Sequence, residues 1–332
     1  MTSPAPGAAP GFVRRSIVVV GTSAGGVSAL RQLVAGLPAG LPAAVFVVMH
    51  SSPEYASRLP EVLSSSGPLP AHAAVHGERI RPGEVYVAPN DSHMTVHRDF
   101  VRVTRGPKEN GHRPAVDPLF RTAARMYGNK VIGVVLTGKL NCGTEGLMAV
   151  KSHGGITVVQ SDPEYAAMPS HARAHVQVEH VTPLALIPEL LVRLIDEPIP
   201  DHSEAEAGGA HTVAPQPANI VCPICQGAMV ERADGGLLRY SCHVGHAFSA
   251  DSLVAEQSEA LEAALWASVR ALEESAQLAD RLSASGAHGL ALRFRDKAEA
   301  LRQHAALIQD VLLHGTTLDA EDVAAQEGML DS

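Results

Sequence analysis

The sequence predicts a doubly wound, Rossmann-like α/β fold with a mostly parallel sheet, followed by a small zinc-ribbon-like module and an α-helical hairpin. Two observations lead to this prediction. Through residues 15–196, short runs rich in β-branched residues alternate with amphipathic helical stretches, which is typical of a parallel sheet covered on both faces. Residues 197–219 then combine Pro, Gly and acidic residues without apolar periodicity, which indicates a linker.

Each element of the α/β domain follows from its local pattern. The expected strands are short β-branched runs at 17–20, 44–49, 85–88, 131–136 and 156–159. The expected helices have helical apolar spacing and cover 26–35, 56–64, 117–127, 143–152 and 183–195. Residues 94–96 and 101–103 are expected to form an antiparallel excursion, and residues 1–14 are expected to be disordered.

Composition and charge limit the classes of function. The chain has 332 residues and a net charge of -9, but residues 1–196 carry +4 (18 basic, 14 acidic) and residues 197–332 carry -13 (8 basic, 21 acidic). Neither part is basic enough to favour nucleic acid. The longest apolar run, 43–49, is too short to span a bilayer, and no signal-peptide core is present. We therefore expect a cytoplasmic protein without nucleic-acid binding or direct membrane insertion.

The C-terminal part is predicted to hold a zinc-ribbon-like module at 220–248, a helical hairpin at 249–315 and an acidic tail at 316–332. Two apolar stripes recur at steps of three and four residues on either side of a break at 283–289. Two such stripes joined by a short turn bury each other as an antiparallel hairpin. This hairpin is a candidate surface for a protein partner.

The first candidate for chemistry is Ser23. The expected strand 17–20 runs directly into GTSAGG and then into a helix. Gly21-x-Ser23-x-Gly25 in this context is the pattern of a nucleophile elbow, with the helix N-terminus available to stabilise an oxyanion. A glycine-rich turn whose serine only caps the helix explains the same residues. A dinucleotide-binding loop fits poorly, because G-x-G-x-x-G is missing and the next strand ends in His50 rather than an acid.

His50 is expected at the same edge of the sheet as Ser23, because both follow parallel strands. It is a candidate general base. A histidine at a strand end also serves as an ordinary surface or packing residue.

Residues 15–195 resemble the catalytic domain of the CheB-type chemotaxis protein-glutamate methylesterases. The resemblance rests on six blocks in the order of that family: VVVGTSAGG, VFVVMH, VYVAPNDSHM, RPAVDPLF, VVLTGKLNCGTEGL and AMPSHA. It implies a Ser23 nucleophile, a His50 base, and hydrolysis of a glutamate γ-methyl ester or deamidation of a glutamine. The substrate implied is a methylated protein, chemoreceptor-like or of another signalling kind. About 16 residues precede the first strand, so no receiver domain is expected in this chain.

The third catalytic position of the family departs from its pattern. Where the family has an aspartate before the glycine that opens the helix, this chain has Cys142 before Gly143. A neutral thiol is a poor partner for His50. Glu145 is either a substitute acid or a solvated residue of the first helical turn, and Lys139 stands where the family has a methionine near the oxyanion. The chain is therefore either an impaired esterase or a non-catalytic regulatory protein on a decayed esterase fold.

A second group of residues, three cysteines and a histidine, has the sequence spacing of a metal-binding site. Cys222 and Cys225 form C-x2-C, and after sixteen intervening residues Cys242 and His246 form C-x3-H. Four such ligands suit a closed, structural zinc site. His243 competes with His246 as the fourth ligand. No cofactor is expected for catalysis.

Overall fold

The computed structural model describes residues 12–51, 57–200, 214–234, 237–285 and 288–314. The chain forms two compact units that divide after Ala250. The first unit contains the α/β domain and a small antiparallel sheet, and the second contains two helices. Residues 1–11 and the predicted acidic tail lie outside the described residues.

The centre of the first unit is a seven-stranded sheet in which every neighbouring pair is parallel. Its strands, in spatial order, are β10 (His180–Thr182), β9 (Ile156–Gln160), β8 (Val131–Val135), β2 (Ile17–Thr22), β3 (Ala44–Met49), β5 (Val85–Val87) and β4 (Ala71–Ala73). The predicted parallel α/β fold is confirmed. The expected strands of this sheet did not include its two edge strands, β4 and β10, which have three residues each, and the expected helices did not include α5 (Ala167–His175).

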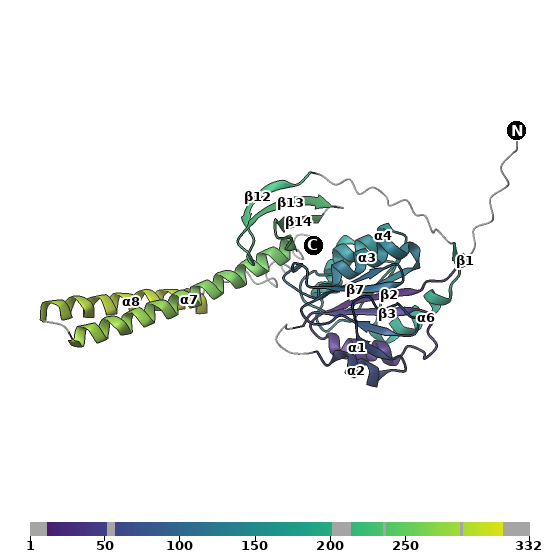
Figure 1. Cartoon of the computed structure of the whole chain (residues 1–332), viewed down its shortest axis with the longest axis horizontal. Helices are drawn as coiled ribbons and strands as arrows, with labels where there is room; N and C mark the ends of the chain where they lie inside the picture. Colours follow the sequence, from purple (N-terminus) through teal and green to yellow (C-terminus); the bar gives the residue numbers. More distant parts are fainter. Residues whose placement is uncertain (1–11, 52–56, 201–213, 235–236, 286–287, 315–332) are drawn as a thin grey trace, which may run out of the picture. The chain divides into compact units, whose positions relative to one another are not determined.

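Helices cover both faces of this sheet (Figure 1). One layer consists of α1 (Gly26–Ala35), α2 (Leu59–Ser66) and α6 (Ile187–Asp196), and the other of α3 (Val116–Tyr127), α4 (Thr144–Ser152) and α5 (Ala167–His175). Alternate side chains of β2 enter the two layers: Val18 and Val20 pack in the first core, Ile17 and Val19 in the second. Because both faces are covered, the whole strand is apolar.

Two further strand pairings complete the α/β domain and correct its predicted limits. The expected antiparallel excursion is β6 (His93–His97) with β7 (Phe100–Thr104). β1 (Phe12–Val13) pairs with β11 (Ile199–Pro200). Residues 12–13 therefore form a strand, although disorder was expected there. Residues 199–200 of the expected linker belong to the same strand pair. Residues 201–213 of that linker lie outside the described part of the chain.

The small sheet has four antiparallel strands: β12 (Gln216–Val221), β13 (Ala228–Asp234), β14 (Leu237–Cys242) and β15 (Ala247–Ser249). It begins inside the expected linker and contacts the α/β domain. We call residues 216–249 the Cys3His module.

The second unit is formed by α7 (Ala250–Ser285) and α8 (His288–His314). Their contacts run in opposite order along the two helices: Gln309 donates to Glu273 at 3.3 Å, and Arg302 pairs with Asp280. The predicted antiparallel hairpin is confirmed. Its apolar stripes are buried only in part: Ala276, Ala279 and Ala298 pack with Phe294 and Leu301, while Leu261, Leu282 and Leu290 are exposed. No helix in the described part of the chain has the length and apolar character needed to cross a membrane.

Candidate active site and metal centre

Ser23 lies on a tight turn between β2 and α1. Its backbone N–H donates to the carbonyl of Thr137 at 3.1 Å, and its own carbonyl accepts from Gly26 at 2.9 Å. Gly25 has φ 73°, a left-handed conformation that glycine adopts without steric cost. This conformation reverses the chain from strand to helix within three residues, so Ser23 is presented at the carboxyl edge of the sheet.

The surroundings of Ser23 leave no space for larger side chains. A Cβ on Gly138 would stand 3.0 Å from the Ser23 Cβ and 2.1 Å from the Met168 Sδ. The fully buried Met168 therefore packs beside the serine. Lys139, in contrast, is exposed, with its Nζ 5.8 Å from the centre of the Tyr165 ring. A methionine thus lies near Ser23, although it comes from α5 rather than from position 139.

His50 follows β3, the strand next to β2, and its backbone N–H donates to the Thr22 carbonyl at 3.3 Å. Its ring stacks on His112 with centroids 3.6 Å apart and an interplanar angle of 25°. Both ring nitrogens of His50 are buried and lack a hydrogen-bond partner in the described part of the chain. An unpaired buried polar group costs about 1–3 kcal/mol, so its persistence here favours a functional role.

Burial and the neighbouring His112 hold the pKa of His50 well below its ordinary value, and burial lowers the pKa of His112 to about 4. Both rings are therefore neutral at pH 7. Since their pKa values fall on folding, the stability that depends on these rings is complete above pH 6.5 and decreases as the pH falls toward 4.

We expect a nuclear magnetic resonance titration of the histidine Cε1–H signals to place both midpoints below 6.5. His112→Phe keeps a stacked ring and removes a titrating neighbour, so the His50 midpoint should rise only in part, because burial is the larger cause. A His50 midpoint at 6.5 or above in the unmodified chain would contradict the buried, neutral base.

Cys142 lies in the loop between β8 and α4, and its thiol is turned toward the start of α3. The thiol donates to Asp117 Oδ2 at 3.6 Å and accepts from the Val116 N–H at 3.4 Å. Burial and the charge of Asp117 raise the pKa of Cys142 well above its ordinary value. The thiol therefore stays protonated and cannot supply the negative charge that a catalytic histidine needs.

Asp117 has a buried carboxylate, and no role for it was predicted from the sequence. It accepts hydrogen bonds from the N–H groups of Gly143 and Gly146 at 3.0 and 2.7 Å and from Asn110 Nδ2 at 3.1 Å. These bonds stabilise the N-terminus of α4, where backbone N–H groups lack partners within the helix. Asp117 thus fixes the loop that carries Cys142.

Glu145 is neither a solvated residue nor a partner of His50 in this structure. Its carboxylate pairs with Arg239 of β14 and lies 3.6 Å from Arg121 Nη1. Burial and the charge of Asp117 raise the pKa of Glu145 to about 7, against the two guanidinium groups that lower it. The local sequence does not indicate this contact, because Arg239 lies 94 residues after Glu145 and is brought close to it only by folding.

The second candidate site is formed by two turns of the Cys3His module. Cys222 and Cys225 lie in the turn between β12 and β13, while Cys242 ends β14 and His246 precedes β15. Their ligand atoms all lie within 4.8 Å of one another. The separations are 3.5 Å for Cys225 Sγ to Cys242 Sγ and 3.6–3.7 Å for His246 Nδ1 to the sulfurs of Cys242 and Cys222.

These distances between ligand atoms fit the tetrahedral coordination of a metal ion such as zinc. Zinc bonds of about 2.3 Å to sulfur and 2.0–2.1 Å to nitrogen place neighbouring ligands about 3.6–3.8 Å apart. His243 is not part of the group: a Cβ on Gly227 would stand 2.4 Å from the His243 Cε1, so this ring packs against the first turn. Of the two histidines, His246 belongs to the group of side chains that could hold a metal, and His243 does not.

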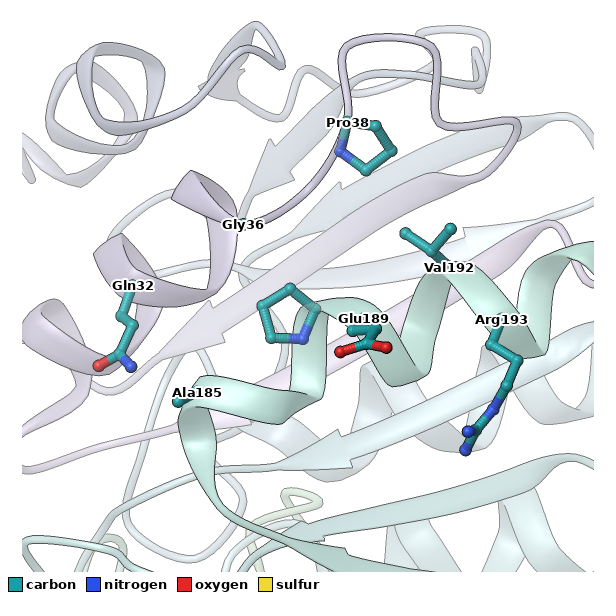
Figure 2. Close-up of a pocket in the computed structure, with 8 residues that line it drawn as sticks. Gln32, Gly36, Pro38, Ala185, Glu189, Val192 and Arg193 are labelled. Carbon is teal, nitrogen blue, oxygen red and sulfur yellow. The ribbon is translucent and has the colours of Figure 1, made fainter.

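A separate hollow of about 540 Å³ lies between the C-terminal end of α1 and α6 (Figure 2). The lining residues labelled in Figure 2 are Gln32, Gly36, Pro38, Ala185, Glu189, Val192 and Arg193. Ser23 precedes the opposite end of α1, and a ten-residue helix is about 15 Å long. The hollow therefore is not the site of Ser23.

A parallel α/β sheet with a serine on a strand-to-helix turn and a histidine at the end of the adjacent strand is an arrangement typical of the serine-hydrolase class. Comparison with known proteins gives the family. Residues 18–191 match the CheB methylesterase family. This chain belongs to the CheB methylesterase family.

Individual relatives agree with this assignment. The protein-glutamate methylesterase/protein-glutamine glutaminase 3 of Anaeromyxobacter dehalogenans is 42% identical over 176 residues, which is 52% of either chain. The corresponding protein of Thermotoga maritima is 36% identical over 190 residues, 55% of either chain. The crystal structure of the Thermotoga maritima CheB methylesterase catalytic domain superposes with a TM-score of 0.53 and 34% identity, covering 55% of this chain and 100% of that domain. The chain thus spans about half the length of the curated relatives it matches.

Proposed function

We propose that this chain is a carboxylic-ester hydrolase that removes the γ-methyl ester of glutamate residues in a methylated signalling protein. The observation that carries the proposal is the placement of Ser23 and His50 directly after the carboxyl ends of the adjacent parallel strands β2 and β3. The names of the relatives, protein-glutamate methylesterase and protein-glutamine glutaminase, supply the substrate class.

In this mechanism the Ser23 hydroxyl attacks the ester carbonyl while His50 accepts its proton. The backbone N–H groups of Ala24 and Gly25 are our candidates to stabilise the oxyanion. The tetrahedral intermediate collapses, and His50 returns the proton to departing methanol. Water, deprotonated by His50, then cleaves the acyl-enzyme to give glutamate and free Ser23. With a glutamine side chain the same steps release ammonia instead of methanol.

The neutral Cys142 predicts a slow enzyme. A catalytic carboxylate fixes the tautomer of the histidine and stabilises the imidazolium, and its loss in serine proteases costs about four orders of magnitude. The same observation favours the second candidate function, a non-catalytic binding or regulatory protein on a decayed esterase fold. His50, with no partner for either ring nitrogen among the described residues, is consistent with both.

The other parts of the chain have supporting roles in this proposal. Cys222, Cys225, Cys242 and His246 would hold one structural zinc, which leaves no open coordination position for chemistry. The C-terminal hairpin would contact a protein partner. The substrate would be a chemoreceptor-like protein or another methylated signalling protein of the cytoplasm, as in chemotaxis.

A labelling experiment distinguishes the two candidate functions. A fluorophosphonate probe should modify the purified chain at Ser23, identified by peptide mass spectrometry, because it reacts with activated serines. Ser23→Ala should remove both the label and the turnover of a methyl-ester substrate, whereas Ser51→Ala, at a nearby partly buried serine, should retain them. Absence of label on the folded, metal-loaded chain would reject the esterase and favour the non-catalytic protein.

A further inference from the structure

The Cys3His module contacts the loop that carries the stacking partner of His50. The Asn110 N–H donates to the Ala247 carbonyl at 2.7 Å, and the Ala247 N–H donates to the Lys108 carbonyl at 3.2 Å. The Ser249 N–H donates to Asn110 Oδ1 at 2.9 Å. β15 thus extends along residues 108–110, and two residues further on His112 stacks on the ring of His50.

The module also contacts the loop of Cys142. Ser249 Oγ donates to Asn141 Oδ1 at 2.9 Å, next to Cys142. Asn110, which is bound to β15, donates through Nδ2 to Asp117, the carboxylate that fixes the start of α4. A three-residue strand of the module therefore contacts both segments that surround His50 and the third catalytic position.

A partly buried ion cluster strengthens this contact. Arg239 of β14 donates to Glu109 at 2.9 Å and pairs with Glu145, while Arg121 donates to both oxygens of Glu109 at 2.7 and 2.8 Å. The four side chains are only 18–26% exposed. Loss of Arg239 would leave the carboxyl groups of Glu109 and Glu145 with a single guanidinium partner, that of Arg121.

These contacts depend on the metal turns. Arg239 lies three residues before Cys242, and Ala247 directly follows His246. The module has few buried apolar side chains of its own, among them Met229 and Phe248. Small domains of this kind commonly obtain much of their folding free energy from the metal.

We propose that the Cys3His module is a metal-dependent brace that holds the loop 108–112, and through His112 the ring of His50, in the catalytic arrangement. Arg239 and Ser249 are its positioning residues. The proposal rests on the assignment of His50 as the base, but the placement of the loop can be measured without any enzymatic activity.

The experiment compares the full-length, zinc-loaded chain with Arg239→Met and with the chelated chain. Hydrogen exchange at the amides of residues 108–112 and 141–147 should accelerate at least about tenfold in both perturbed forms, as local opening becomes easier. Modification of His50 by diethyl pyrocarbonate should increase in parallel. Arg232→Met is the matched control, because Arg232 is exposed and lies opposite Arg239 in the strand ladder. It should leave both readouts unchanged.

Arg239→Lys adds a rescue test, because lysine restores the charge without the fork that reaches two carboxylates. It should give exchange rates between those of the unmodified chain and Arg239→Met. The brace is overturned if residues 108–112 and His50 respond to neither chelation nor Arg239→Met. If the exchange and modification results hold but no form reacts with a fluorophosphonate, the esterase assignment fails and the brace stands.

Discussion

Cys142→Asp is expected to raise ester hydrolysis by roughly two to four orders of magnitude, on the scale measured when a serine-protease triad loses its aspartate. A carboxylate at this position would lie at the third catalytic position, while both nitrogens of His50 lack a partner in the described structure. The new carboxylate would turn away from Asp117, because the present thiol is only 3.6 Å from that charged oxygen. The measurement is turnover of a methyl-ester substrate near neutral pH.

Two controls isolate the charge. Cys142→Asn has the shape of aspartate without its charge, and Cys142→Ser also removes the thiol; neither should increase turnover. Ser23→Ala in each background excludes a contaminating esterase. The aspartate variant should also raise the pKa of His50, because an opposite charge favours the imidazolium. Equal rates for aspartate and serine at position 142, in folded proteins, would reject the decayed-triad explanation.

Zinc removal is expected to unfold the Cys3His module before the α/β domain. Metal analysis of protein purified without chelators should give one zinc per chain. The binding free energy of such sites is on the order of 10 kcal/mol, which exceeds what a small apolar core supplies. Chelation should therefore expose the thiols of Cys222, Cys225 and Cys242 to a thiol reagent, and the buried Cys142 should react more slowly than these three.

Cys222→Ser should reproduce the effect of chelation, whereas Cys142→Ser, which is outside the cluster, should keep the zinc. Fragment-resolved hydrogen exchange should show the largest loss of protection in residues 216–249, with the smaller acceleration in residues 108–112 and 141–147 that the brace predicts. Protein that contains no zinc and has three freely reactive thiols as purified would refute the metal centre.

Some of the site follows from local sequence. The β-branched run that ends in GTSAGG indicates both the buried strand β2 and the turn that presents Ser23, because the glycines allow that turn and larger residues do not. His50 follows from the same reasoning, since neighbouring parallel strands end at one edge. The C-x2-C and C-x3-H spacing likewise locates the ligands, because each pair is held by its own short turn.

Other features depend on contacts between distant segments, and the sequence alone could not resolve them. Glu145 occupies the first turn of a helix, where solvent exposure is the ordinary expectation, but the return of β14 brings Arg239 onto it. The choice of His246 over His243 was also undecided, because both are within reach of Cys242 along the chain. Only the packing of His243 beside Gly227 excludes it.

The sequence by itself determined the parallel α/β fold, the places of Ser23 and His50 and the three cysteines of the candidate metal site, because each depends on side chains within one strand or turn. The tertiary structure decided what surrounds them: His112 on His50, Asp117 on Cys142 and the Cys3His module on loop 108–112. Those contacts join segments that are separated by 25 to 139 residues. No local periodicity encodes such pairings, because they are formed by the packing of whole elements.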